Sequence, residues 1–494
     1  AGGRADLAAA TLREGATRCP AALDLPLALG RLLLAAKDAA GAAAAFADAV
    51  ARQPGHAEAH ALFGMALRGA GRNNEAVAAY RAALALAPAL DDVRHNLGFA
   101  LIELGHYRDA LAAFQLLTAH RPHDPEAWLG LGLAHDWLGE LAAAEAAYAQ
   151  GIRIAPDHLG LQNNIASVYL GLNRLDDALA AFDRAAQLKN DHDRPVEGGR
   201  QMLLHRVRHD AEQLRYLAGQ RVELDPASRD CLAALESLEA RHAGQPGVER
   251  IPVEPALAAR LRPTLSRIVH RAPAPRLEGG ALNPALDWAA HAKTYLDSTP
   301  QVVVIDDFLR PEALAALRRY CLESTVWKTP RAYGYMGALI GDGFASPLLL
   351  QIVAEMRERL AAILAPHPLA QAWAYKYDST LRGINIHADC AAVNVNFWIT
   401  PDDANLDPAS GGLVVWDQAP PADWGLLRTQ NPDKTEILQF LHDTGARALK
   451  VPHRQNRMVL FNSALFHKTD DTHFREGYEN RRINVTLLYG NGLR

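Results

Sequence analysis

Small, aromatic and proline residues recur at a fixed spacing from the start of the chain to about Asn190. Four prolines follow one another at equal intervals, at Pro54, Pro88, Pro122 and Pro156. The same spacing separates Ala42, Ala76, Ala110, Ala144 and Ala178, as well as Phe46, Tyr80, Phe114, Tyr148 and Phe182. It also separates Gly30, Gly64, Gly98 and Gly132, with Ala166 at the fifth position. The pattern predicts helix pairs that cross closely at small residues, with an aromatic ring in each seam and a proline after each second helix.

This pattern resembles the tetratricopeptide repeat, with five copies from about Ala21 to Lys189. The resemblance implies an all-α solenoid over residues 1–190 whose first helices line a groove. In the repeat register the groove positions include His95, Asn96, Phe99, Trp137, Asn163 and Asn164. Two of these asparagines, Asn96 and Asn164, share one repeat position. They either hydrogen-bond the backbone of an extended peptide or satisfy neighbouring helix backbone and water.

The repeat pattern stops after residue 190, and shorter helical patterns follow. The predicted helices are Arg200–Glu223, Pro226–His242 and Glu254–His270, and Arg271–Pro284 has the composition of a surface linker. We interpret residues 191–295 as a helical connector that sets the angle between the repeats and the next domain.

From residue 296 to 494 the pattern changes to short strands mixed with helices. The predicted strands are Val302–Ile305, Trp373–Tyr377, Val393–Ile399, Leu413–Trp416, Met458–Phe461 and Arg481–Tyr489. The predicted helices are Pro311–Cys321 and Ser346–Leu364. Arg331–Phe344 is predicted as a loop at a barrel mouth, and Trp424–Arg447 as a lid. The whole chain is therefore predicted to be a multidomain α + β protein.

Candidate metal chemistry is concentrated in residues 383–400, which read GINIHADCAAVNVNFWIT. Side chains two apart on a strand point to the same face, so His387 and Asp389 are predicted to aim at a common point. On the strand that follows, Asn394 and Asn396 share a face in the same way.

A third ligand is required, and His467 follows an apolar strand near the end of the chain. Three competitors, His442, His453 and His473, are less well placed, because His453 precedes its strand and His473 lies in a polar insert. Two histidines and one carboxylate form the facial triad of non-haem Fe(II) oxygenases. Zinc hydrolysis is disfavoured, because no general base is evident beside these residues.

His387, Asp389, His467 and Arg482, in this order, resemble the 2-oxoglutarate- and Fe(II)-dependent dioxygenases with a prolyl-hydroxylase-like catalytic domain. The segment Gln301–Cys321 is similar to the strand and helix that open such domains. The resemblance implies a double-stranded β-helix, or jelly roll, over residues 296–494. It also implies Fe(II), 2-oxoglutarate and O₂ as cofactor and cosubstrates.

The resemblance assigns the distal carboxylate of 2-oxoglutarate to Arg482. The gap between His467 and Arg482 is longer than is usual in these enzymes, so Arg481 stays an alternative. The phenols of Tyr375 and Tyr377 and the amide of Asn394 are further candidates for the cosubstrate site, although tyrosines in barrels usually serve packing. The carboxylate at position 389 favours hydroxylation, since related halogenases replace it with a small residue.

Composition narrows the function further. The 494-residue chain is 49% hydrophobic and 22% charged, with a formal net charge of −5, which does not suggest nucleic-acid binding. No run of eighteen apolar residues predicts a membrane span, and the chain does not open on a leader-like segment. The four cysteines are scattered without pairing motifs, which favours a reducing, cytoplasmic location.

Together these patterns predict a dioxygenase that hydroxylates a side chain of a peptide or protein recruited by the repeat groove. One alternative is an oxygenase of small molecules or amino acids whose repeats serve docking or homodimerisation. Another is an adaptor in which the oxygenase domain is inactive.

Overall fold

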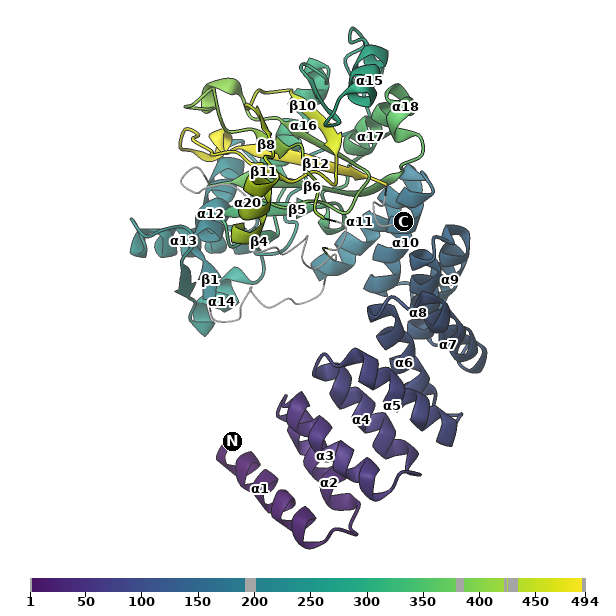
Figure 1. Ribbon diagram of the computed structural model, residues 1–494. Helices are drawn as coiled ribbons and strands as arrows, with labels where there is room; N and C mark the ends of the chain where they lie inside the picture. The colour runs from purple at the N-terminus through teal and green to yellow at the C-terminus, as the bar shows by residue number, and fades with distance from the viewer. Residues whose placement is uncertain (1, 192–200, 379–385, 422–423, 425–433, 491–494) are drawn as a thin grey trace. The chain divides into compact units, whose positions relative to one another are not determined.

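A computed structural model describes residues 2–191, 201–378, 386–421, 424 and 434–490. Contacts within the chain divide it into two compact units, Ala1–Val168 and Tyr169–Arg494. The first unit consists of helices, and the second joins helices to β-sheets (Figure 1). The division falls before residue 190, where the repeat pattern ends, so the last repeat helix makes its contacts within the second unit.

Antiparallel helices form the first unit, each packed against the next along the chain. They are α1 (Gly2–Arg18), α2 (Asp24–Ala35), α3 (Ala39–Arg52), α4 (Ala57–Gly69), α5 (Asn73–Leu86), α6 (Asp91–Glu103), α7 (Tyr107–His120), α8 (Pro125–Trp137) and α9 (Leu141–Ile154). Helix α10 (Leu159–Gly171) spans the division between the units. Asp38 caps α3 by accepting a hydrogen bond from the Gly41 amide at 2.8 Å. Gly71, Gly105 and Gly139, with φ of 76° to 79°, turn the chain between the helices of a pair.

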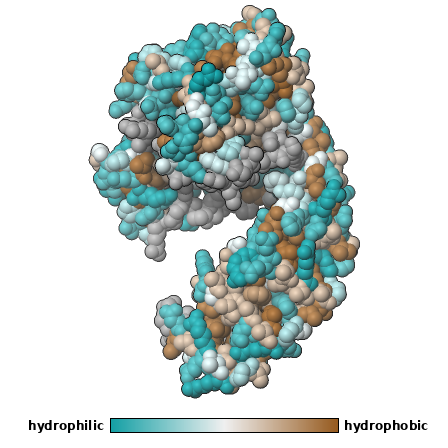
Figure 2. Space-filling model, in the orientation of Figure 1, coloured by the Kyte–Doolittle hydropathy of each residue, from teal (hydrophilic) through white to brown (hydrophobic). Residues whose placement is uncertain are grey.

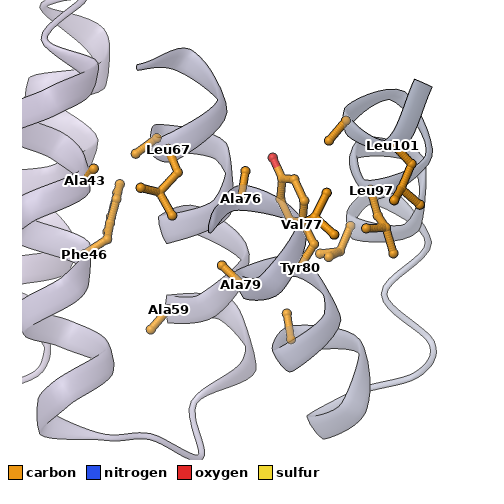
Figure 3. Packing of buried hydrophobic residues seen from close by; sticks show 14 of the residues in the cluster. Ala43, Phe46, Ala59, Leu67, Ala76, Val77, Ala79, Tyr80, Leu97 and Leu101 are labelled. Carbon is orange, nitrogen blue, oxygen red and sulfur yellow. The ribbon is translucent and has the colours of Figure 1, made fainter. Parts of the chain in front are cut away.

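The aromatic residues of the repeat fill the seams between helices, as the spacing predicted. Phe46, Tyr80, Phe114 and Tyr148 are all at most 1% exposed, and Figure 3 shows Phe46 and Tyr80 among small and aliphatic side chains. A Cβ added to Gly98 would lie 2.6 Å from the ring of Phe114. Glycine is therefore required at this crossing because any side chain would overlap the ring.

The helical start of the second unit contains α11 (Leu175–Asp191), β1 (Gln201–Leu203), α12 (Leu204–Gly219), α13 (Pro226–Arg241), β2 (Arg250–Pro252) and α14 (Pro255–Leu261). The strands β1 and β2 pair antiparallel, and α12, α13 and α14 share one apolar core. The predicted helix from Glu254 to His270 is too long, since α14 ends at Leu261. Pro263 explains this end, because a proline disfavours helical geometry at the residue before it.

Two larger antiparallel sheets form the rest of the second unit. The first has the order β3 (Val302–Ile305), β10 (Met458–Asn462), β7 (Val393–Trp398), β12 (Ile483–Tyr489), β6 (Leu369–Tyr377), β5 (Tyr335–Leu339) and β4 (Thr329–Arg331), and we call it the larger sheet. The smaller sheet has the order β11 (His467–Thr469), β8 (Leu413–Trp416) and β9 (Ala448–Val451). The accompanying helices are α15 (Trp288–Asp297), α16 (Pro311–Glu323), α17 (Pro347–Arg359), α18 (Ala361–Leu364) and α20 (Lys434–Asp443).

Side chains from both sheets share an apolar core. It contains Val302, Val459 and Phe461 from the larger sheet together with Leu413 and Val415 from the smaller one. Because side chains alternate along a strand, the larger sheet has one face toward this core and an opposite face toward the helices. The inner face is the one that carries the candidate site residues.

A loop predicted in this domain was wrong. Arg331–Phe344 was predicted as a loop, but it contains β5 and the last residue of β4, which pair antiparallel. Gly334, at φ 88°, allows the tight turn between these strands, and Tyr335, Met336 and Ala338 are buried. Helix α20 lies in the predicted lid Trp424–Arg447, and residues 425–433 of this segment are outside the described part of the chain. The role of this segment as a lid stays a prediction.

Candidate metal centre and anion site

Three metal-ligating side chains that are distant in the sequence meet in the second unit. His387, Asp389 and His467 each offer one ligand atom, and these atoms all lie within 4.8 Å of one another. Nε2 of His467 lies 3.3 Å from Oδ2 of Asp389, and Nε2 of His387 lies 3.7 Å from Oδ1. Two imidazole nitrogens and one carboxylate make a donor set suited to a divalent transition metal.

A backbone bridge, rather than the regular strand predicted from the sequence, positions His387. The backbones of His387 and His467 exchange two hydrogen bonds, of 3.0 and 2.9 Å. The amide of Asp389 donates to the carbonyl of Ser463 at 3.1 Å. Bends follow at 390–392, so the predicted strand was wrong in extent, and 383–385 lie outside the described residues. The bonds to the segment around β11 still bring both side chains to one point.

Neighbouring groups orient the candidate ligands. Nδ1 of His467 lies 2.9 Å from the carbonyl oxygen of Leu465, and donation of its proton there leaves Nε2 as the ligating atom. The Asn394 amide donates to Oδ2 of Asp389 at 2.7 Å. Burial acts to raise the pKa of Asp389, but His467, His387 and Asn394 outweigh it and hold this pKa below its ordinary value. The carboxylate is therefore ionised at neutral pH.

Polar side chains continue from Asp389 across the inner face of the larger sheet. The Asn396 amide donates to the carbonyl oxygen of the Asn394 side chain at 2.6 Å. Asn484 and Thr486, on the adjacent strand β12, both donate to Oδ1 of Asn396 at 2.8 Å. This buried network fixes the rotamers of the asparagines and through Asn394 the position of the Asp389 carboxylate.

Arg482 lies on the inner face and is 2% exposed. Its Nε and Nη2 donate to the carbonyls of Gly411 and Gly412 at 2.6 and 3.1 Å. Its guanidinium carbon is 4.6 Å from the ring centroid of Tyr377. Nη1 is buried and has no hydrogen-bond partner of ordinary geometry among the described residues. Burial lowers the pKa of Arg482 from its ordinary value. The guanidinium thus keeps one donor available for an anion.

The neighbouring residue Arg481 has a different environment. Its Nε lies 2.6 Å from Oε2 of Glu212, and its Nη1 lies 3.6 Å from Oδ2 of Asp378. Burial acts to lower the pKa of Arg481, but the two carboxylates raise it above its ordinary value. Arg481 is already paired with acidic groups of the protein, which leaves Arg482 as the better candidate for a ligand carboxylate.

The two candidate tyrosines lie on β6 but make different contacts. The hydroxyl of Tyr377 is 3.0 Å from Oγ1 of Thr469, two residues beyond the candidate ligand His467. Tyr375 packs against Tyr335, with ring centroids 4.7 Å apart, and burial raises its pKa to about 12. Tyr377 is therefore connected to both Arg482 and the strand of His467, whereas the ring contacts of Tyr375 are those of packing.

The competing histidines do not join the cluster of donor atoms. His442 is 85% exposed in its side chain and lies beside Asp443. His453 is buried next to Phe474, with ring centroids 5.0 Å apart, and His473 is exposed. Sequence reasoning missed Thr469. The available signal was alternation along the strand, which places Thr469 on the same face as His467.

A cavity of about 710 Å³ opens beside the metal-ligating residues. Its lining includes Asp389, Cys390, Ala392, Tyr295 and Ile363. This volume is within the range of pockets that bind small molecules or the side chains of a bound peptide.

Comparisons with known proteins identify the N-terminal repeats. Sequence models of the tetratricopeptide repeat match residues 67–134 and residues 27–91 and 138–193. The N-terminal part of the chain therefore carries tetratricopeptide repeats, as predicted. No curated protein matches the chain. Separately, none of the helices in the described ranges has the length and apolar character needed to cross a membrane.

Several solved structures are similar to part of the chain. MamA from Desulfovibrio magneticus RS-1 is 20% identical with a TM-score of 0.34, covering 35% of this chain and 97% of MamA. The tetratricopeptide protein TTC0263 from Thermus thermophilus is 25% identical with a TM-score of 0.29, covering 34% and 93%. PilF from Pseudomonas aeruginosa is 19% identical with a TM-score of 0.31, covering 45% and 93%. Each similarity covers less than half of this chain.

Proposed function

We propose that the second unit is an Fe(II)- and 2-oxoglutarate-dependent dioxygenase with a jelly-roll core, which hydroxylates a side chain of a peptide or protein. The observation that carries the proposal is the convergence of His387, Asp389 and His467 in one domain. The inner face of the larger sheet in this domain also holds the buried Arg482, whose Nη1 has no hydrogen-bond partner among the described residues. Neither feature alone is specific. Together they supply a place for a metal ion and for an organic acid, which this chemistry requires.

The donor set fits ferrous iron. Two neutral imidazoles and one carboxylate bind Fe(II) while leaving coordination positions open to other ligands. His467 presents Nε2 because its Nδ1 is held by the Leu465 carbonyl, and Asp389 is held by Asn394. Iron bound there would supply the activation of O₂ that is coupled to oxidative decarboxylation of 2-oxoglutarate.

The inner face fits a dicarboxylate cosubstrate. Arg482 is buried and Asp470 acts on it only at a distance, with no ion pair between the two, so a ligand carboxylate would compensate its charge. Nη1 supplies a free donor, and Tyr377 holds the guanidinium through its ring. We assign the distal carboxylate of 2-oxoglutarate to Arg482, and not to Arg481, which already pairs with Glu212.

Apolar side chains around the candidate ligands limit access of water. Ile386, Ala388 and Phe466 flank the ligand positions in the sequence and are buried in one cluster with Ile437 and Leu441 of α20. Phe461 lies against His467, with ring centroids 4.9 Å apart. Exclusion of water protects reactive species and strengthens the charge interactions inside the site.

The repeats of the first unit favour a peptide or protein substrate, because tetratricopeptide repeats generally bind such partners. Half-buried apolar residues, among them Leu62 and Phe99, lie at the first-helix positions, and Met65 is 43% exposed. In Figure 2 the visible face of the repeat helices carries hydrophobic residues, in brown and tan, mixed with hydrophilic ones. An adaptor without activity is the second candidate function, and the match to repeat models is what favours it.

Turnover of 2-oxoglutarate by the purified full chain distinguishes the two functions. We expect succinate to form when Fe(II), 2-oxoglutarate and O₂ are supplied, and to be absent when iron is omitted or chelated. Enhancement by a peptide that binds the repeats would identify a peptide substrate, whereas enhancement by a free amino acid would support the small-molecule alternative. Failure to form succinate under all these conditions would leave the adaptor function.

A further inference from the structure

Helix α12 lies in the segment predicted as a connector, but it is buried on two sides. Its apolar side, with Leu204, Val207 and Leu214, belongs to the core shared with α13 and α14. The opposite side carries His205, His209, Glu212, Gln213 and Tyr216, which are spaced to share one helical face. A helix that only links two domains has no need of a second buried face made of polar side chains.

The polar face of α12 contacts the sheet-containing part of the second unit. Nε2 of Gln213 donates to the carbonyl of Ser324 at 2.9 Å. His209 lies between Trp327 and Tyr478, with ring centroids 6.2 and 5.9 Å away. These contacts seat the helix on the side of the larger sheet that is opposite to the candidate site.

One contact of this face reaches the residues that lead into β12 and include Arg482. Oε2 of Glu212 lies 2.6 Å from Nε of Arg481, whose side chain is 5% exposed. Arg481 and Arg482 are consecutive, so they point to opposite faces of the sheet. Glu212 therefore neutralises the arginine that lies directly behind the candidate anion site.

Arg481, held by its ion pair with Glu212, also contacts Tyr377. Nη1 of Arg481 donates to the Tyr377 carbonyl at 3.4 Å, and the Tyr377 amide donates to the Arg482 carbonyl at 3.0 Å. On the inner face, the Tyr377 ring lies under the Arg482 guanidinium and its hydroxyl contacts Thr469. A displacement of Arg481 would consequently shift both residues that hold the anion-binding group.

We propose that Glu212 is a positioning residue for the cosubstrate site, and that α12 is a working part of the oxygenase unit. Its ion pair with Arg481 fixes the backbone at 481–482 and Tyr377, so that Arg482 keeps one orientation toward the carboxylate of 2-oxoglutarate. The inference rests on the proposed function, since it concerns the affinity for that cosubstrate. Groups of this kind, one step removed from the ligand, commonly alter affinity by about ten-fold or more when removed.

The test is a calorimetric titration of 2-oxoglutarate into Mn(II)-loaded full-length protein without oxygen. The variant Glu212→Gln should weaken binding of 2-oxoglutarate about ten-fold, while its affinity for Mn(II) stays that of the wild type. Glu212→Asp should restore part of the affinity because it keeps the charge. The matched control is Glu236→Gln. Glu236 lies on α13 and is an exposed partner of Arg215, so its replacement should change neither affinity.

If Glu212 had a purely structural role, Glu212→Gln would lower the free energy of unfolding but would leave the ratio of the 2-oxoglutarate affinity to the Mn(II) affinity unchanged. Should Glu212→Gln fail to fold, the double variant Glu212→Gln/Arg481→Met removes both charges of the pair and avoids an unpaired buried one. Weak 2-oxoglutarate binding with normal Mn(II) binding in that protein supports the proposal. Wild-type affinity in either variant overturns the positioning role alone. Absence of 2-oxoglutarate binding in the wild type overturns the proposed function and this inference with it.

Discussion

Two consecutive arginines illustrate how local surroundings divide roles at the scale of single residues. Arg481 is compensated by Glu212 and Asp378, so its charge is satisfied by the protein itself. Arg482 is equally buried but is held by backbone carbonyls, which carry no net charge. A buried cation without a counter-ion is costly, and such groups are commonly found where a charged ligand binds.

Replacement of Arg482 by Gln should weaken 2-oxoglutarate binding by about 2–5 kcal/mol, thirty-fold or more, because the ligand carboxylate would lose its charge partner. Metal affinity should stay unchanged, since Arg482 is not among the donor atoms. Calorimetry with Mn(II)-loaded protein measures both quantities. Arg447→Gln is the control, because that side chain is 86% exposed. Equal 2-oxoglutarate affinity in wild type and Arg482→Gln would remove Arg482 from the anion site.

The sequence was sufficient to select three side chains that the structure brings together, because residue type and strand alternation narrow the choice for His387 and Asp389. That these side chains bind a metal ion stays a prediction. The sequence could not choose between Arg481 and Arg482, since a shift of one residue in register exchanges the two faces of a strand. Nor could it identify Glu212, whose contact with Arg481 joins residues 269 apart in the chain. Such contacts depend on tertiary packing that no local pattern encodes.

At the scale of elements, the repeat helices were predictable because each pair of helices packs through the same kinds of residues at the same spacing. A glycine, an alanine and an aromatic ring at fixed spacing describe one seam, and the pattern recurs in register. The strands of the second unit were less predictable. Strand β5 was predicted as part of a loop because glycine and tyrosine occur in loops as well as in strands, and its pairing with β4 and β6 makes it part of the sheet.

Substitution Gly98→Ala should destabilise the first unit. The new Cβ would lie 2.6 Å from the Phe114 ring, and overpacking of this kind costs about 1–3 kcal/mol, more than the gain of up to about 1 kcal/mol in helix propensity. Gly55→Ala is the control, since a Cβ there meets nothing within 4 Å. Urea unfolding followed by far-UV circular dichroism measures both variants. If the two variants are equally stable, Gly98 is not required for the seam.

The packing of α12 predicts acid sensitivity of the second unit. Burial lowers the pKa of His209 to about 3 and that of His205 to about 4. Both are neutral in the folded state, whereas the unfolded chain protonates its histidines below about pH 6.5. The unfolded state then binds more protons, so the free energy of unfolding falls as the pH drops from about 6.5 toward 4.

Thermal unfolding between pH 7.5 and pH 5 measures this slope. His209→Asn should flatten the dependence on pH, whatever its effect on stability at pH 7.5, because one of the groups that takes up a proton on unfolding is removed. His442→Asn should retain the wild-type slope, since that side chain is exposed. A slope that is the same in wild type and His209→Asn would contradict the buried neutral state of His209.

At the scale of the whole molecule, the chain combines an interaction module with a candidate reaction centre. The repeats of the first unit are recognisable in the sequence because each contacts only its neighbours. The candidate centre of the second unit depends on two segments distant in the sequence, around His387 and His467, that meet through one backbone bridge. The division of labour that we propose follows from this architecture: the repeats select a partner, and the second unit carries the chemistry.

The measurement that tests the central claim most directly is the iron content of purified full-length protein after anaerobic loading with Fe(II) and removal of the excess. We expect about one ion per chain in the wild type and in the control Asp443→Ala, whose side chain is exposed. Asp389→Ala should fold normally and retain almost no iron, because two imidazoles alone bind Fe(II) weakly. Iron content in Asp389→Ala equal to that of the wild type would contradict the assignment of the metal centre.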